Sequence, residues 1–293
     1  MIPAILRDIQ AAAVSWSGDN ALRLSAALAY YALLSVTPLI LILIALAALF
    51  YGEAAAGQHV GEQIRGLAGN TAGDAMLSLM RSAHQSRSGA VAVISGTVLL
   101  FIGASGVFGE LKAAMNSIWG VTAAPGKTVR SFFGQRLISM LAILAVGSVL
   151  ITAVAASAIL SAVISSGYIP VPGSAARLFD FTLTLLVTMV LFLALFVILP
   201  DVRIRWADVW LSAALTAFLF TLGKFLIALY LGTTGVASSY GAAGSVIVIQ
   251  LWVYYSACIL FFGVELTKAT TLRRRGVVTP RGSSMRAEDL PKE

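Results

Sequence analysis

The chain has 293 residues, of which 59% are hydrophobic and only 11% are charged, and its mean hydropathy is +0.91. Soluble domains carry about 25% charged residues, so this composition excludes an ordinary soluble protein and indicates a polytopic membrane protein. The net charge of +7 does not indicate nucleic-acid binding, because excess Lys and Arg in membrane proteins reflects membrane topology and contact with anionic lipid headgroups. The single cysteine, Cys258, excludes a disulfide within the chain and a metal site built from thiolates.

Residues 1–24 predict a short helix that lies on the membrane surface. Their apolar side chains recur at helical spacing, at Ile2, Ile5, Leu6 and Ile9. The polar side chains of this stretch are expected elsewhere around the helix: Arg7, Asp8 and Gln10. The alternative is a frayed polar terminus.

Six apolar runs are each long enough to cross a hydrocarbon core of about 30 Å as a helix that rises about 1.5 Å per residue. They cover residues 24–51, 89–111, 137–164, 178–199, 207–231 and 244–267. The fold class is therefore all-α, with a six-helix membrane domain at 25–270. Two short amphipathic helices are predicted in the first extracytoplasmic loop, 52–88. The polar segment 271–293 is predicted to be a disordered basic cytoplasmic tail.

The basic residues predict the orientation of this domain. Six spans place both termini on one side of the membrane. When the connections are assigned alternately, the side with the termini holds fifteen Lys and Arg, the opposite side holds four, and Lys224 lies within the membrane. Because cytoplasmic loops carry the excess of basic residues, we expect both termini in the cytoplasm.

Polar side chains inside the apolar runs are the candidate functional residues, since each needs a partner away from lipid. On the sixth span, Gln250, Tyr254 and Glu265 share one face of the helix. Lys224 and Gln250 lie at similar depths below the outer surface. With Tyr254 and Tyr240 they form a predicted outer polar site. The alternative for Lys224 is that its stem snorkels toward the interface.

A second polar group is predicted at the cytoplasmic ends of the spans. It consists of Glu110, Lys112, Asn116, Arg203 and Glu265. These residues are expected at one level of the membrane, where opposite charges can meet. The alternative for Glu110 and Glu265 is a purely structural pairing at the interface. Together, the two groups are the predicted pathway of a solute.

Soluble catalytic patterns are missing from the sequence. There is no phosphate loop, no zinc-binding H-E-x-x-H helix and no G-x-S-x-G nucleophile turn. His59 and His84 are twenty-five residues apart without a second ligand at helical spacing, so they are interpreted as solvated loop residues rather than a metal pair. We expect no catalytic residue, metal or cofactor.

Four segments resemble the YihY/BrkB family of bacterial inner-membrane proteins: residues 27–43, 105–121, 199–217 and 239–269. The most specific pieces are Tyr240-Gly241, the run around Trp252, the ending Gly263-Val264-Glu265-Leu266, and Asn116-Ser117-Ile118-Trp119. The resemblance implies a six-span inner-membrane protein, and members have been labelled serum-resistance factors and candidates in lipid or lipopolysaccharide movement. Another label in the family, tRNA-processing ribonuclease BN, implies clustered His and Asp ligands, which this sequence lacks.

The leading functional hypothesis is a transporter or flippase-like protein that moves an amphipathic or anionic solute, lipid-linked solutes included. The alternative is a non-transporting scaffold in envelope assembly, in which polar residues only join helices. A lipid enzyme ranks third among the hypotheses, because no nucleophile–base pair is visible in the sequence. The expected partners are anionic lipid headgroups and an unknown solute, without nucleic acid, and a homo-oligomer is compatible with the sequence.

Overall fold

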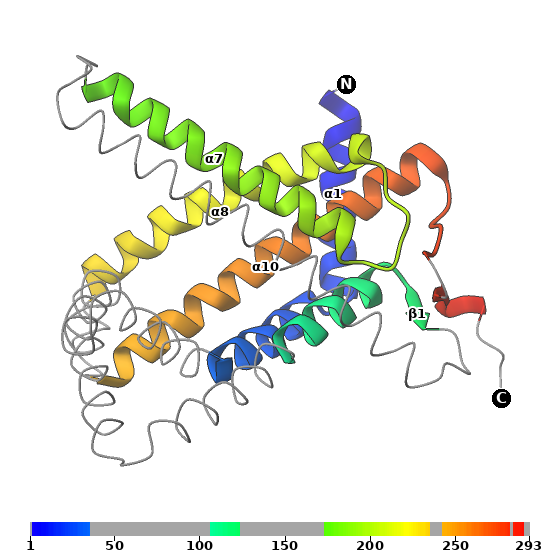
Figure 1. Ribbon diagram of the computed structural model, residues 1–293, viewed down its shortest axis with the longest axis horizontal. Coiled ribbons are helices and arrows are strands. Elements are labelled where there is room, and N and C mark those ends of the chain that lie inside the picture. The colour runs from blue at the N-terminus through cyan, green and yellow to red at the C-terminus, as the bar shows by residue number, and fades with distance from the viewer. Residues whose placement is uncertain (1, 36–105, 124–172, 235–241, 282–283, 290–293) are drawn as a thin grey trace, which may run out of the picture. The chain divides into compact units, whose positions relative to one another are not determined.

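The computed structural model describes residues 2–35, 106–123, 173–234, 242–281 and 284–289 (Figure 1). These residues are mostly helical, in agreement with the predicted fold class. They fall into two compact units, which are treated separately below. The first unit contains Met1–Ala21, Lys112–Leu222 and Ile259–Glu293, and the second contains Leu22–Leu111 and Gly223–Cys258. The predicted third span, the loop 52–88 and most of the first two spans lie outside the described residues.

The N-terminal helix α1 covers Ile2–Gly18, which confirms a helix within the predicted segment 1–24. The chain then turns at Asn20, whose φ of 54° is a left-handed conformation that asparagine tolerates better than most residues. A second helix covers Ala21–Ser35, so the helix of the predicted first span begins a few residues early. The predicted polar face of α1 needs one correction, because Asp8 is only 3% exposed and lies on the buried side.

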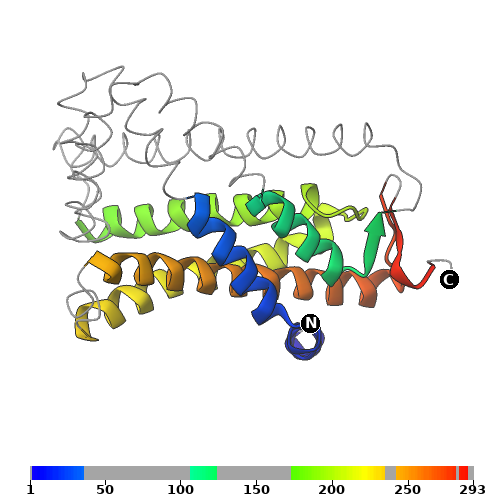
Figure 2. The same cartoon turned by 90° about the horizontal axis from the view of Figure 1, so that it is seen from below.

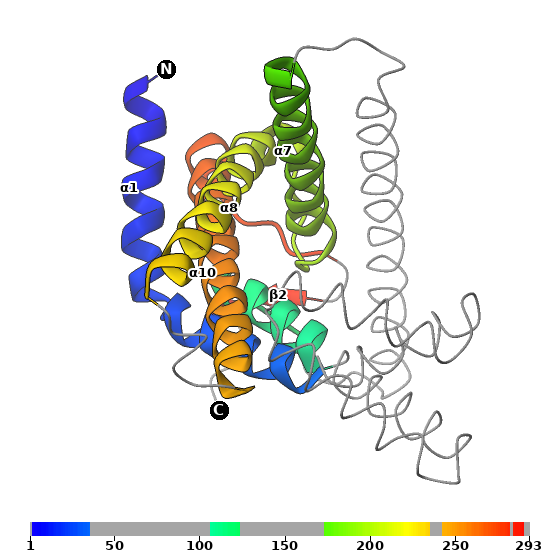
Figure 3. The same ribbon diagram turned by 90° about the vertical axis from the view of Figure 1, so that its left-hand side faces the viewer.

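Helices α7 (Gly173–Ile198) and α8 (Trp206–Thr234) agree with the predicted fourth and fifth spans. Pro200 disfavours helical backbone at the residue before it, which explains why α7 stops there. Within the first unit, α7 and α8 follow one another in the sequence and pack against each other (Figure 3). Phe192 of α7 and Phe220 of α8 pack edge to face, with ring centroids 5.6 Å apart.

Helix α10 covers Ala242–Arg275 and continues about two turns beyond the predicted sixth span. Three arginines occupy its last turn, where positive charge is stabilised by the negative end of the helix. Gly276 then ends the helix with a φ of 74°, and its amide donates to the Leu272 carbonyl at 2.7 Å. This is a left-handed cap, which glycine adopts without steric cost.

The segment after α10 turns back along the first unit instead of leaving it. Strand β2 (Ser284–Arg286) pairs antiparallel with β1 (Val121–Ala123), and the two run side by side in Figure 2. A one-turn 3-10 helix, η1, follows at Ala287–Asp289. We call the described residues 277–281 and 284–289 the C-terminal strap.

The C-terminal strap also contacts the loop between α7 and α8. Val202 and Pro280 form an isolated antiparallel bridge. The Arg203 amide donates to the Thr279 carbonyl at 2.9 Å, and the Arg281 amide donates to the Asp201 carbonyl at 2.7 Å. The prediction of a disordered tail is therefore wrong for these residues. They are ordered by backbone pairing with distant segments, which does not depend on apolar composition.

The core of the first unit lies where helix 106–118, α7, α8 and α10 meet. Met115, Phe196, Val209 and Phe261 are each at most 1% exposed. Gly263 of α10 permits this packing, because a Cβ there would overlap Thr216 of α8 and Phe196 of α7. Small residues at such contacts allow membrane helices to approach closely.

Large apolar side chains also cover the outer surfaces of the helices. The window Phe181–Ile198 has a mean hydropathy of 2.8, yet only 17% of it is buried. Windows of α8 and α10, Trp206–Gly223 and Gln250–Arg275, are also long and apolar enough to cross a membrane. Exposed apolar surface of this extent is suited to lipid rather than to water.

Several hydroxyl groups in these helices donate to the backbone of their own helix. Thr216 donates to the Ser212 carbonyl at 2.7 Å, and Thr267 donates to the Gly263 carbonyl at 2.8 Å. Ser256 makes the same bond to the Trp252 carbonyl. Such bonds to the preceding turn allow polar side chains to lie in an apolar environment.

Candidate functional site: a polar pocket between α1 and α10

A pocket of about 280 Å³ lies along the seam between α1 and the C-terminal part of α10. Its α1 wall comes from Arg7, Asp8, Ala11 and Ser15, and its α10 wall comes from Glu265, Lys268, Ala269, Leu272 and Arg273. The α10 residues are spaced three or four apart, so they form one face of the helix. The pocket therefore combines charged side chains from two helices of the first unit.

Glu265 is the most deeply buried charged residue of this pocket, with a side chain only 1% exposed. Lys268 lies one turn away, and its Nζ is 3.7 Å from Glu265 Oε2. The same Nζ is closer to Asp19 Oδ2, at 3.1 Å. Neither carboxylate oxygen of Glu265 meets hydrogen-bond geometry with a described residue, although Asp19 and Lys268 both lie beside the carboxyl group. Glu265 is thus stabilised by a shared ammonium but has unused capacity to accept hydrogen bonds.

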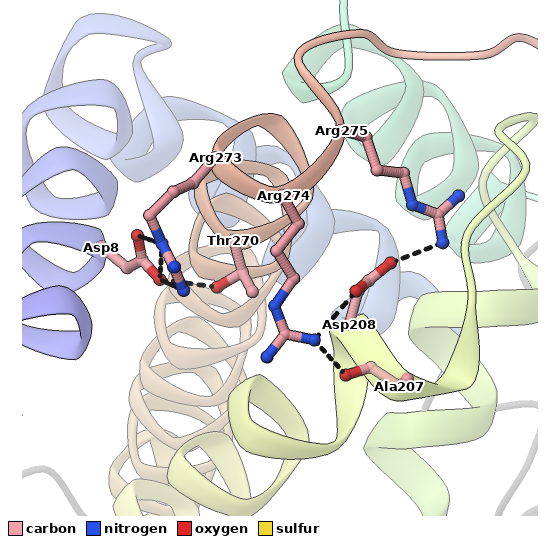
Figure 4. Close-up of polar contacts among 7 residues, drawn as sticks. All are labelled: Asp8, Ala207, Asp208, Thr270, Arg273, Arg274 and Arg275. Atoms are coloured by element: carbon pink, nitrogen blue, oxygen red, sulfur yellow. Dashed lines mark hydrogen bonds and ion pairs between the residues drawn. The ribbon is translucent and has the colours of Figure 1, made fainter. Parts of the chain in front are cut away.

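Asp8 closes one end of the pocket through a bidentate pair with Arg273 (Figure 4). The Arg273 Nε donates to Asp8 Oδ1 at 2.8 Å, and Nη2 donates to Oδ2 at 2.9 Å. The Thr270 hydroxyl also donates to Oδ2, at 3.3 Å. These bonds compensate the cost of burying Asp8 and attach α1 to α10.

Asp208 joins the start of α8 to the end of α10 in a similar way (Figure 4). It is only 5% exposed and lies in the first turn of α8, where the helix end favours negative charge. Arg274 Nη1 donates to Asp208 Oδ1 at 3.1 Å and to the Ala207 carbonyl at 2.9 Å. Arg275 Nη2 donates to Asp208 Oδ2 at 2.6 Å.

Asp201, in the loop between α7 and α8, binds two of the predicted site residues. Lys112 Nζ lies 2.9 Å from Asp201 Oδ1. The Asn116 amide nitrogen donates to Oδ2 at 3.0 Å, while Asn116 Oδ1 accepts from the Asp201 backbone amide at 2.9 Å. Helix 106–118 is thereby attached to the loop that the C-terminal strap also contacts.

The predicted cytoplasmic cluster does not form as one group among the described residues. Lys112 and Asn116 meet at Asp201, whereas Glu265 pairs with Lys268. Arg203 is exposed, and its backbone amide donates to the C-terminal strap. The loop is extended at this point, so the side chain of Arg203 points away from the side on which Val202 is buried. Glu110 is half-buried and has no hydrogen bond or ion pair to another described residue.

The predicted outer site is only partly described. In the second unit, Gln250 is half-buried and its Oε1 has no hydrogen-bond partner in the described part of the chain. Tyr254 is half-buried and lies beside Cys258, one turn along α10. Tyr240 and the side chain of Lys224 lie outside the described residues, so the expected meeting of Lys224 with Gln250 stays a prediction.

Four carboxylates that organise the site were not among the predicted residues: Asp8, Asp19, Asp201 and Asp208. Asp8, Asp19 and Asp201 were missed because they lie outside the apolar runs, and Asp208 because it lies at the very start of one. Two of them carry a signal in the sequence. Asp8 lies three residues after Ile5 and four before Ala12, so it occupies the apolar face of α1 and needs a cation. Asp208 opens a helix, and the chain offers three consecutive arginines that close another.

Comparison with known proteins now identifies the family. The family model described as Virulence factor BrkB matches residues 12–288. The chain belongs to this family. The BrkB match includes both helices of the pocket apart from the first ten residues of α1, and it extends into the C-terminal strap.

Individual relatives match the chain over shorter lengths. A UPF0761 membrane protein of Cronobacter sakazakii (strain ATCC BAA-894) is 29% identical over 187 residues, which are 64% of this chain and 60% of that protein. A UPF0761 membrane protein of Yersinia pestis (strain Pestoides F) is 36% identical over 84 residues, which are 28% of this chain and 29% of that protein. The matched region thus covers less than two thirds of these curated relatives. No solved structure matches the chain. The BrkB family membership and the apolar helices together make this an integral membrane protein.

Proposed function

We propose that this BrkB-family protein moves an amphipathic or anionic solute across the bacterial inner membrane without changing it chemically. In this proposal the chain spans the membrane six times, both termini lie in the cytoplasm, and anionic lipid headgroups gather at its basic cytoplasmic face. The solute belongs to the membrane or is linked to a lipid, because the pocket lies on helices whose outer surfaces are apolar. Nucleic acid has no role.

The observation that supports this proposal most directly is the pocket around Glu265. A carboxylate that is 1% exposed and accepts no hydrogen bond from the described residues is costly. Charged residues within membrane helices mark substrate and ion pathways. A bound solute that donates hydrogen bonds to Glu265 would offset the cost of burying it. The pocket is lined by Glu265 and also by Arg7 and Lys268, which suit an anionic group.

Reconstitution into liposomes tests the proposal. Fluorescent phospholipids in the inner leaflet are protected from a membrane-impermeant reductant until the protein moves them outward. We expect the wild-type protein to accelerate this movement and Glu265→Gln to slow it by at least about tenfold, the effect of one charge-assisted hydrogen bond. Arg281→Gln, an exposed arginine outside the pocket, is the matched control. Equal rates in Glu265→Gln and wild-type liposomes would remove the pocket from the pathway.

A scaffold in envelope assembly is the second candidate function. It is favoured by the acid–base pairs that fasten α1, α8 and α10, namely Asp8 with Arg273 and Asp208 with Arg274 and Arg275. Pairs of this kind hold helices together without a moving part. If wild-type liposomes move neither lipid nor soluble anions faster than protein-free liposomes, the scaffold is the better explanation.

A further inference from the structure

The charges in the pocket are unequally satisfied, and this difference indicates what the pocket holds. Arg273 is engaged by Asp8 through two close hydrogen bonds. Lys268 is nearer to Asp19 than to Glu265. The carboxylate oxygens of Glu265 have no hydrogen-bond partner among the described residues, and Arg7 lines the same pocket. Arg7 is exposed, and no ion pair joins it to another described residue.

We propose that this pocket binds a zwitterionic group in which a primary ammonium lies a few bonds from a phosphate. The ammonium donates hydrogen bonds to the free oxygens of Glu265, and the phosphate faces the guanidinium of Arg7. This ligand rests on the proposed function, for which it supplies the chemical class of the solute. The same chemistry occurs in an aminophospholipid headgroup and in free aminoethyl phosphate.

Charge balance favours a zwitterion over a simple anion. The pocket lining holds the cations Arg7, Lys268 and Arg273 and the carboxyl groups of Asp8 and Glu265, and Asp19 pairs with Lys268 at its edge. An anion alone would leave Glu265 without a donor and would place more negative charge beside it. A ligand that carries both charges satisfies Glu265 and Arg7 and does not alter this balance.

Size and depth are also suitable. A pocket of about 280 Å³ has room for about nine water molecules at ~30 Å³ each, so a small headgroup fits but a sugar-rich one does not. Its α10 wall continues from Glu265, within the predicted sixth span, to Arg273 beyond the end of that span. This is the depth at which phospholipid headgroups lie.

The test measures which lipids the full chain retains in detergent. The purified protein is incubated with equal amounts of phosphatidylethanolamine, phosphatidylcholine and phosphatidylglycerol with identical acyl chains, and the bound lipids are counted by native mass spectrometry. We expect phosphatidylethanolamine to be retained about tenfold over the other two lipids. The quaternary amine of choline cannot donate a hydrogen bond, and glycerol has no positive charge.

Variants assign each half of the ligand. Glu265→Gln should abolish the preference for phosphatidylethanolamine, whereas Arg7→Gln should weaken all three phospholipids about equally. Arg281→Gln should change neither property. Equal retention of the three lipids by the wild-type protein would overturn the proposal, as would an unchanged preference in Glu265→Gln. The comparison of lipids needs no variant, so a variant that fails to fold does not remove the test.

Competition with free O-phosphoethanolamine separates the two sources of the ligand. Displacement of phosphatidylethanolamine means that the headgroup alone suffices. Retention against excess competitor means that the acyl chains are also required, and both results keep the ammonium–phosphate assignment. Because the assay contains no bilayer, it is independent of transport. Selective retention without movement in liposomes would end the transport proposal alone, and movement without selectivity would end the ligand assignment alone.

Discussion

Buried carboxylates hold the first unit together at individual residues. Asp8 and Asp208 are 3% and 5% exposed, and each accepts hydrogen bonds from arginines at the end of α10. A charge this deeply buried is tolerated only because a guanidinium compensates its lost hydration. Removing one partner of such a pair is therefore strongly destabilising, because the other charge stays buried without compensation.

Asp8→Asn tests this residue-scale argument. The amide cannot accept two charge-assisted hydrogen bonds from Arg273, so we expect the melting temperature to fall by about 4 °C or more. Tryptophan fluorescence during heating in detergent measures the transition. The matched control is Asp289→Asn, which weakens a pair with Arg286 in which both side chains are more than 40% exposed. That control should shift the transition by no more than about 1 °C, and equal shifts in both variants would contradict the argument.

Only part of the candidate site could be predicted, because only polar residues in or beside the apolar runs are conspicuous in the sequence. Glu265, Lys112 and Asn116 stand out in the sequence because polar groups in or beside apolar runs are unusual. Asp201 and Asp19 lie in connections, where an acidic residue is ordinary. Their roles depend on which connection meets which helix. That is a property of tertiary packing and is not encoded in local spacing.

At the scale of elements, the C-terminal strap fastens a loop. Its residues bridge Val202, accept from the Arg203 amide and pair β2 with β1. Each contact uses backbone groups, so the strap restrains the loop irrespective of side-chain identity. The loop carries two arginines, Arg203 and Arg205, that are exposed and suitable for protease cleavage.

Truncation after Gly276 tests the strap. Without it, we expect trypsin to cleave after Arg203 and Arg205 about tenfold faster, because local opening of the loop no longer breaks hydrogen bonds with Thr279 and Arg281. Mass spectrometry of the fragments follows the rate at these two sites. A truncation after Asp289 keeps both β2 and η1 and should behave like the full chain. If truncation after Gly276 leaves the cleavage rate unchanged, the strap does not restrain the loop.

The helices themselves were largely predictable from the sequence. The predicted spans 178–199, 207–231 and 244–267 agree with α7, α8 and α10 because about twenty apolar residues in lipid permit little besides a helix. The strap was not predictable. A three-residue strand such as β2 has no apolar pattern of its own, and its partner β1 lies some 160 residues earlier in the chain.

At the scale of the whole molecule, basic residues serve two purposes. Of the fifteen on the predicted cytoplasmic side, six form ion pairs with other described residues: Lys112, Lys268, Arg273, Arg274, Arg275 and Arg286. Setting these aside leaves nine, which still exceeds the four on the opposite side. Pairing therefore does not remove the asymmetry. Acidic residues contribute little to orientation in any case.

Thiol labelling tests the predicted orientation directly. In a Cys258→Ser background, Glu288→Cys places a thiol on the C-terminal strap, where Glu288 is 70% exposed, and Ser86→Cys places one in the predicted extracytoplasmic loop 52–88. A membrane-impermeant maleimide applied to intact spheroplasts should label the thiol at position 86 and leave the one at 288 unmodified until the membrane is opened. Because six spans require both termini on one side, a thiol added before Met1 should behave like the one at position 288. Opposite labelling of the two ends would mean an odd number of spans. It would also contradict the pocket itself, because Asp8 of α1 and Arg273 of α10 pair there and must lie on the same side of the membrane.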